Sequence, residues 1–222
     1  MGFAAQVFAH LPGSPSFRKR LKFFYFDLMA RIGLVQSPAL FSLDRKAEPY
    51  LPAGFGVFVE VGANDGVSQS NTWFFERYKG WTGLLIEPVP ALAAMASRFR
   101  RAPVANVALG AADGGRLELS VSDLTTTADT GRIGADAVLM SVPIRALSSL
   151  LDEHGLSHID FFSLDVEGLE VEVLRGLDLT RHRPGCMLVE TADINAVLAV
   201  LSAHYRLETK LTFHDYLLRA ID

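Results

Sequence analysis

The sequence predicts an α/β protein in which a mostly parallel β-sheet is covered by helices on both faces. Three observations support this prediction. Apolar runs alternate with helical patterns from residue 57 onward, a glycine-containing turn follows the first run, and the last residues read as an antiparallel hairpin. Crossovers in such doubly wound sheets are right-handed, and the ligand binds beyond the carboxyl ends of the strands.

Each expected element has a local signature. The strand segments are short and apolar, and the segments between them carry apolar residues at helical spacing. Residues 116–122 alternate in period two, as a half-exposed antiparallel strand does, and the polar residues 123–137 indicate a loop. The expected strands cover 57–61, 83–87, 104–110, 116–122, 138–144, 159–168 and 186–190, with a terminal hairpin over 205–211 and 213–221. The expected helices cover 71–80, 91–101, 146–155, 169–177 and 194–204.

Residues 1–50 differ from the rest and are predicted to form a helical extension to a main domain over 51–222. Ser14-Pro15 suits a helix start. The favoured interpretation is a helix packed on the main domain with a solvated basic face. The alternative is contact with a membrane surface or a partner. The apolar positions are Phe17, Leu21, Phe24, Leu28 and Ile32, and the basic positions are Arg18, Lys19, Arg20 and Lys22.

Composition narrows the class of protein. A chain of 222 residues, half of them hydrophobic, is typical of one domain. Its net charge of −4 argues against nucleic-acid binding, because phosphate neutralisation needs a basic face. No apolar run approaches the roughly 18 residues of a membrane span, and the start lacks the basic region of a secretory signal. We therefore expect a cytoplasmic protein, or one peripheral to a membrane, of unspecified oligomeric state.

The stretch "FVEVGANDG" leads from an apolar strand, which contains Glu60, into a tight turn. Gly62 and Gly66 allow close approach to the backbone. Asn64 stands where a dinucleotide fingerprint has its middle glycine, and Asn is the non-glycine residue that best tolerates positive φ. The change weakens the case for a bound pyrophosphate, which needs bare backbone. A cofactor with a ribose but no phosphates, such as S-adenosylmethionine, fits better.

Glu87 ends the second expected strand, 21 positions after Gly66. An acid at about this distance from a glycine loop holds ribose hydroxyls. A carboxylate can accept hydrogen bonds from both hydroxyls at once. The alternative interpretation is an ordinary charged strand end.

Five segments occur in a specific order: residues 58–76, 83–90 ("GLLIEPVP"), 106–114 ("NVALGAADG"), 159–179 and 213–221. Together they resemble the FkbM family of S-adenosylmethionine-dependent methyltransferases, over most of the chain from about residue 57. The resemblance implies a class I methyltransferase fold, which is a Rossmann-like, seven-stranded sheet with an antiparallel last strand. It also implies methyl transfer, commonly to a hydroxyl of a sugar, glycolipid or polyketide-like acceptor.

The resemblance assigns cofactor contacts to residues near the ends of the first three strands. The loop and the acid hold the nucleoside, a polar trio opening the first helix lines the methionine end, and the third strand ends beside adenine. The residues are Glu60, Gly62, Asn64 and Gly66 in the loop, Ser70, Asn71 and Thr72 in the trio, Glu87 as the acid, and Ala108 and Leu109 at the third-strand end. The N-terminal segment and the Thr-rich loop match nothing in the family, and we expect acceptor specificity there.

Asp165 matches the family residue between cofactor and acceptor, at the mouth of the fourth strand. Methylation of a hydroxyl requires removal of its proton, and the candidate bases are Asp165, Glu167 and His214, with Asp215 as a further option. Helix capping is the alternative role for Asp165 and Glu167. For His214 the alternative is a structural role. Asp165, Glu167 and Glu190 also suit Mg²⁺, but capping and solvent exposure explain them equally, so no metal site is predicted.

Two other functions stay open. An NAD(P)-dependent oxidoreductase would share the fold and the acid at Glu87, although the central glycine and a recognisable Tyr-x-x-x-Lys pair are missing. A non-catalytic module with a methyltransferase-like fold would act as a scaffold or binding subunit, since fold alone does not determine function. Cofactor titration would distinguish these functions.

Overall fold

The computed structural model describes residues 37–122, 125–127 and 138–221, together with eight residues of the preceding segment. Those eight are Phe17, Leu21, Phe24, Tyr25, Leu28, Met29, Ile32 and Leu34.

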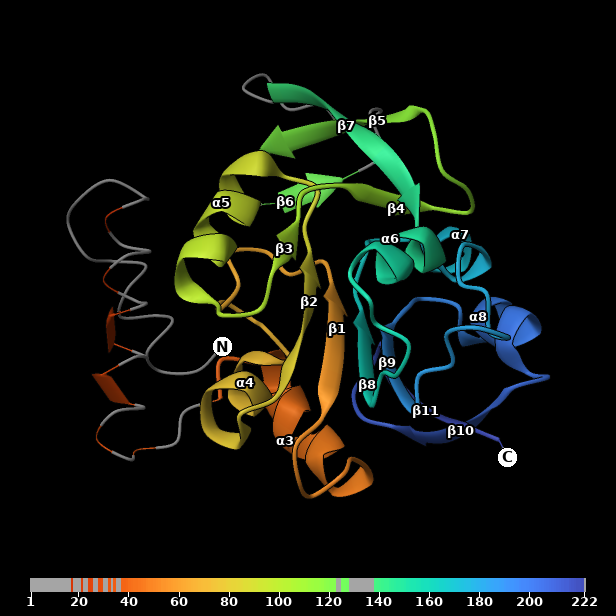
Figure 1. Ribbon diagram of the computed structural model, residues 1–222, viewed down its shortest axis with the longest axis horizontal. Helices are drawn as coiled ribbons and strands as arrows, with labels where there is room; N and C mark the ends of the chain where they lie inside the picture. The colour runs from red at the N-terminus through yellow and green to blue at the C-terminus, as the bar shows by residue number, and fades with distance from the viewer. Residues whose placement is uncertain are drawn as a thin grey trace.

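Seven strands form the central sheet (Figure 1). They are β1 (Val57–Val61), β2 (Thr82–Ile86), β3 (Val104–Ala105), β8 (Phe161–Leu164), β9 (Cys186–Glu190), β10 (Tyr205–Lys210) and β11 (Asp215–Ala220). Their spatial order is β10-β11-β9-β8-β1-β2-β3. Strands β3, β2, β1, β8 and β9 pair in parallel, whereas β11 runs antiparallel to both β9 and β10. The predicted parallel sheet and terminal hairpin are confirmed.

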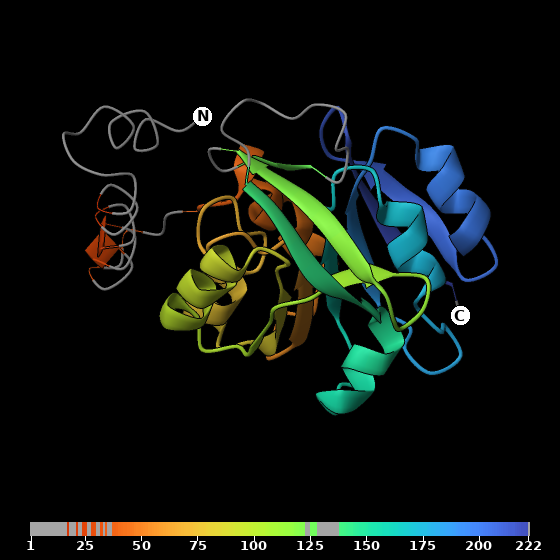
Figure 2. The same ribbon diagram turned by 90° about the horizontal axis from the view of Figure 1, so that it is seen from above.

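A second sheet has the order β4-β7-β5-β6. Its strands are β4 (Ala108–Gly110), β5 (Arg116–Ser122), β6 (Thr125–Thr127) and β7 (Val138–Ala146). Figures 1 and 2 show β5 and β7 crossing beyond the carboxyl ends of the parallel strands. The antiparallel pairing expected for residues 116–122 is confirmed, with β7 and β6 as partners.

The single strand predicted over residues 104–110 is wrong, because the chain divides it between the two sheets. Asn106 lies at the break. Its side-chain amide donates to the carbonyl oxygens of Glu87 (2.8 Å) and Pro88 (2.9 Å), so the chain turns away from β2 after Ala105. An apolar run alone does not reveal this turn.

Helices cover both faces of the central sheet (Figure 1). Because strand residues alternate between faces, Phe58 packs with α3, α4 and α5, whereas Val59 packs with α6, α7 and α8. The helices are α3 (Leu43–Ala47), α4 (Trp73–Lys79), α5 (Pro90–Phe99), α6 (Leu147–Glu153), α7 (Glu170–Arg175) and α8 (Ile194–Leu201), with 3-10 turns η1 (Leu40–Ser42) and η2 (Glu48–Tyr50).

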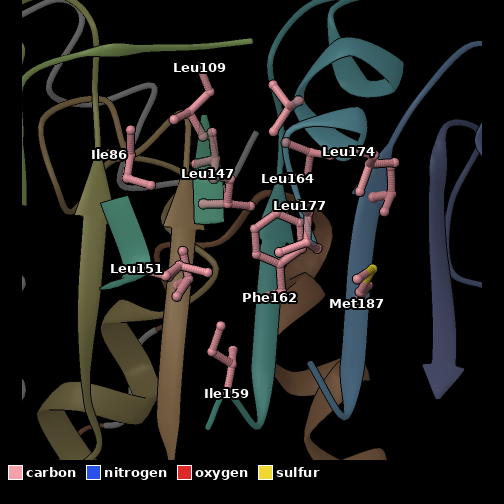
Figure 3. Close-up of a cluster of buried hydrophobic side chains, with 14 of the residues drawn as sticks. Ile86, Leu109, Leu147, Leu151, Ile159, Phe162, Leu164, Leu174, Leu177 and Met187 are labelled. Atoms are coloured by element: carbon pink, nitrogen blue, oxygen red, sulfur yellow. The ribbon is translucent and has the colours of Figure 1, made fainter. Parts of the chain in front are cut away.

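The larger core lies between the sheet and α6 to α8 (Figure 3). Phe162 of β8 is fully buried there, against Leu147 and Leu151 of α6 and Leu174 of α7. This packing fixes β8 beside β1, and so fixes the two strand ends between which the topology reverses.

The described part of the N-terminal extension is split between buried and exposed residues. Ala39, Leu43 and Ala47 join the core that contains Phe58, and Tyr25 packs against Val67 and Trp73, so contact with the main domain occurs. Ser14-Pro15 and the basic cluster lie outside the described residues, and the domain boundary at residue 50 stays a prediction. Within the described part of the chain, no helix combines the length and the apolar character needed to cross a membrane.

Asp44 is a buried carboxyl group without a cation beside its second oxygen. One oxygen accepts from the Ser37 hydroxyl (2.5 Å) and the Arg45 backbone N–H (2.7 Å), and Oδ2 has no partner. Burial raises the pKa of Asp44 from 3.8 to about 6. The folded protein therefore binds this proton more tightly than the unfolded chain, and its stability falls as pH rises from about 4 to about 6.

We expect Asp44→Asn to stabilise the protein above pH 6, by about 1–3 kcal/mol, because Asn keeps an acceptor and removes the buried charge. Urea unfolding from pH 4 to pH 8 measures this difference, which should vanish near pH 4. Asp113 is the opposite control, since hydrogen bonds from Ser149, Ala146 and Arg145 lower its pKa to about 2. Asp113→Asn should destabilise the protein at neutral pH. If the unfolding free energies of Asp44→Asn and wild type differed by a constant amount from pH 4 to pH 8, the raised pKa assigned to Asp44 would be contradicted.

Candidate active site

The predicted glycine turn lies where the topology reverses, between the carboxyl ends of β1 and β8. Asp165 follows β8, and its backbone N–H donates to the Val61 carbonyl (3.1 Å). Gly62 follows β1 with a φ of 81°, and a Cβ built there would lie 1.9 Å from the Asp165 carbonyl oxygen. A side chain at position 62 would therefore force the two strand ends apart.

The rest of the turn has the conformation expected from its residues. Asn64 has a φ of 51°, which confirms that it holds the left-handed position without glycine. Its carbonyl side-chain oxygen accepts from the Asp65 backbone N–H (2.7 Å). Gly66 has a φ of 82°, and a Cβ there would lie 2.9 Å from the Ala96 backbone of α5. The turn is thus pressed against the following helix.

Glu87 faces this turn from the end of β2. Its two carboxylate oxygens accept backbone N–H groups, one from Asn64 (2.7 Å) and one from Val89 (2.9 Å). The residue is 4% exposed. A carboxylate oxygen can accept more than one hydrogen bond, which is the property that the predicted ribose contact requires. The ribose role of Glu87 stays a prediction. The two backbone hydrogen bonds fix the orientation of its carboxylate beside the turn.

Glu60 and the polar trio come together, but they bond mainly to each other. The Glu60 carboxylate accepts from the Asn71 backbone N–H (2.6 Å) and from the hydroxyls of Ser70 (2.8 Å) and Thr72 (2.5 Å). Asn71 differs from its neighbours, because its Nδ2 donates to Ser163 (3.1 Å) while its buried Oδ1 has no partner. Within the trio, Asn71 is the residue that retains capacity for a ligand donor.

Arg100 is a buried residue of this network that sequence reasoning missed. Its guanidinium donates to the Gly66 carbonyl (2.8 Å), to Thr72 Oγ1 (2.9 Å) and to Glu76 Oε2 (3.1 Å), and it also contacts Glu60. It therefore ties the turn to α4 and α5. A sequence signal was available: Ala96 lies four residues earlier in the apolar run 91–96, and on the expected helix over 91–101 the two positions share one face.

Carboxyl groups gather at the ends of β8 and β9. Asp165 follows β8 and Glu190 ends the neighbouring strand β9, and Asp215 lies opposite Glu190 in the register of β9 and β11. Burial raises the pKa of Asp165 to about 8, and the charges of Glu190, Glu167 and Asp215 add to this effect. Burial also raises the pKa of Glu190. The protonated form of Asp165 is therefore favoured at neutral pH.

The helix-capping alternative for Asp165 is wrong. Helix α7 begins at Glu170, its N-cap residue is Leu169, and no side chain caps it there. The Glu170 carboxylate instead accepts from the Gly168 N–H (2.7 Å). Asp165 is therefore left without a capping function at its strand end.

The other candidate bases are more exposed. Glu167 is exposed with a φ of 52° in the turn after β8. His214 is exposed in the β10–β11 turn, where its carbonyl accepts from the Thr191 N–H (2.8 Å) and its charge acts on Glu190. The structure brings both to the same edge as Asp165. Among the described residues, no group of three or more His, Cys, Asp or Glu side chains has the arrangement of a metal site.

Ala108 and Leu109 do not lie at the end of the third strand. Both are buried in β4 of the second sheet, where they pair with Ile144 and Arg145 of β7. The position after β3 belongs to Asn106, whose side chain bonds to the Glu87 carbonyl. The expected placement is wrong because it assumed one unbroken strand over residues 104–110, whereas the contact of these two residues with adenine stays a prediction.

Taken together, the strand order, the antiparallel β11 and the turn at the switch point define a Rossmann-like protein of the class I methyltransferase fold. The family model described as "Methyltransferase FkbM domain" matches residues 60–218. The chain therefore belongs to the FkbM methyltransferase family.

The chain resembles solved structures at low sequence identity. A methyltransferase FkbM from Methylobacillus flagellatus KT has a TM-score of 0.51 and 17% identity, with 97% of this chain and 58% of that chain covered. A methyltransferase from Geobacter sulfurreducens has a TM-score of 0.45 and 14% identity, with coverage of 97% and 93%. This chain thus spans little more than half the length of the Methylobacillus protein. No curated protein matches the chain.

Proposed function

We propose that this protein uses S-adenosylmethionine to methylate a hydroxyl group of a sugar, glycolipid or polyketide-like acceptor. The observation that carries the proposal is the placement of Asp165. It lies at the switch point, beside Glu190 at the end of the neighbouring strand, and its backbone contacts the glycine turn that faces Glu87. An oxygen acceptor needs a proton acceptor close by, and this pair of carboxyl groups supplies one.

The residues present fit such a cofactor. Glu87 offers oriented carboxylate oxygens for the ribose, and the orphaned Oδ1 of Asn71 suits an N–H donor such as the ammonium group of the methionine end. When bound, the cofactor supplies an activated methyl group with a positive charge. That charge favours the ionised form of Asp165. Asp165 would take the hydroxyl proton as the acceptor oxygen becomes methylated, and the cofactor, having lost its methyl group, would leave as the neutral thioether with the electron pair of the broken carbon–sulfur bond on its sulfur.

The two rival functions make different predictions for cofactor binding. Calorimetric titration with S-adenosylmethionine and with NAD⁺ separates a methyltransferase from an oxidoreductase, and membership of the FkbM family favours the first. A non-catalytic module would give no methylated product. The decisive test compares surface glycans and lipids by mass spectrometry in cells with and without the protein. Loss of one methyl group from one class of product would support the proposal, and identical spectra would count against it.

A further inference from the structure

Apolar side chains are exposed in the segment that precedes the main domain, here called the N-terminal segment (residues 17–34). Ten large hydrophobic side chains are exposed among the described residues, and half of them belong to this short segment. Such concentration marks an interaction surface, whereas single exposed hydrophobic residues are ordinary. The exposed fractions are 52% for Phe17, 66% for Phe24, 41% for Leu28, 58% for Ile32 and 54% for Leu34.

We propose that this exposed apolar edge docks on an anionic lipid surface. The charge of the segment identifies the partner. Residues 17–34 contain five basic residues and one acid, a net charge of +4, so the remainder of the chain carries −8. Apolar and aromatic side chains beside a basic cluster are the pattern of helices that lie in the membrane interface. A second copy would bring an equally basic segment to the same edge, and repulsion would oppose that contact.

Part of the same apolar stripe contacts the main domain. Leu21, Tyr25 and Met29 are half-buried and follow each other at a spacing of four residues. Tyr25 packs against the cluster of Val67 and Trp73. At about 100° per residue these positions adjoin the exposed ones, so the stripe is held by the protein at Tyr25 and left exposed along its flank.

The contact made by Tyr25 has a further effect. Val67 directly follows the glycine turn, and the chain after the segment is tied to the same region by a hydrogen bond from the Gln69 N–H to the Pro38 carbonyl (3.1 Å). Docking of the segment would therefore place the turn close to the lipid surface. This inference does not depend on the proposed methyl transfer.

The test measures binding of the full chain to vesicles by flotation. Vesicles of phosphatidylcholine alone are compared with vesicles that also contain phosphatidylglycerol. We expect binding to the anionic vesicles, weakened by salt, and at least about tenfold weaker binding by the double variant Phe24→Glu/Leu28→Glu. Phe55→Glu is the matched control, because Phe55 is 86% exposed but lies outside the segment. It should bind as wild type does.

Several results would overturn the proposal. One is wild-type binding by the double variant, and another is equal loss of binding in Phe55→Glu. Failure of the wild-type protein to float with anionic vesicles is a third. Sedimentation equilibrium tests the alternative occupant. If the wild-type protein is a dimer that does not bind vesicles, and the double variant is a monomer, the exposed edge contacts a second copy of the chain. Unchanged melting temperature and S-adenosylmethionine affinity in the double variant would show that the fold and the cofactor site are intact.

Discussion

Asp165→Asn should lower methyl transfer at saturating cofactor by at least about a hundredfold, while the protein stays folded. The substitution keeps the shape and the hydrogen-bonding capacity of the side chain at its contact with Glu190, but it removes the group that accepts the proton. Cofactor affinity should change much less, because the predicted ribose contact belongs to Glu87. Single-turnover rates with a methyl acceptor, beside calorimetric cofactor titration, measure both effects.

The pH dependence provides a second measurement on Asp165. Because burial and neighbouring acids raise its pKa to about 8, kcat/KM of the wild-type enzyme should increase with pH up to that region. The residual activity of Asp165→Asn should lack this rise. Asp193→Asn is the control, since Asp193 caps α8 nearby and Asn preserves capping. Wild-type turnover by Asp165→Asn would move the base elsewhere, and His214 would be the next residue to test.

Glu87→Ala should weaken S-adenosylmethionine binding by about 30- to 1,000-fold, the equivalent of roughly 2–4 kcal/mol for a lost pair of charge-assisted hydrogen bonds. Its carboxylate also holds the Asn64 and Val89 backbone N–H groups, so part of the loss will come from disorder of the turn. Calorimetry on Glu87→Ala gives the total effect.

Glu87→Gln separates the two contributions, because Gln retains one acceptor oxygen for the turn but lacks the negative charge. We expect an intermediate dissociation constant and a melting temperature between those of wild type and Glu87→Ala, because one of the two backbone N–H groups loses its acceptor. Glu172→Ala in α7 serves as the control for loss of an acid, because the Glu172 side chain is 47% exposed and pairs with Arg175 of the same helix. An unchanged dissociation constant in folded Glu87→Ala would disprove the ribose assignment.

The parts of the fold that local patterns determine were predictable. Apolar runs and helical spacing located the alternating elements, and period-two alternation identified β5 as antiparallel. The left-handed conformation of Asn64 followed from its side chain and its position. These features depend on residues close together in the sequence, which is why one sequence sufficed.

The features that sequence reasoning missed depend on contacts between distant residues. The break between β3 and β4 is made by the Asn106 side chain at the end of another strand. The Glu60 carboxylate bonds to the polar trio and contacts Arg100, which lies 40 positions later in the sequence, so its role depends on a distant residue. The raised pKa of Asp165 depends on its burial among other carboxyl groups. Composition and periodicity do not contain this information.

The position of β11 has a consequence for synthesis on the ribosome. This strand lies inside the sheet, between β9 and β10, although it is the last of the seven to be made. Until β11 emerges, β9 presents an unpaired edge and β10 has no neighbour in the sheet. The nascent protein therefore exposes strand edges that can pair with other chains. Insertion of β11 also brings Asp215 opposite Glu190. The same event that completes the sheet therefore sets the electrostatic surroundings of the candidate catalytic pair, and a chain stalled before it would be prone to aggregate.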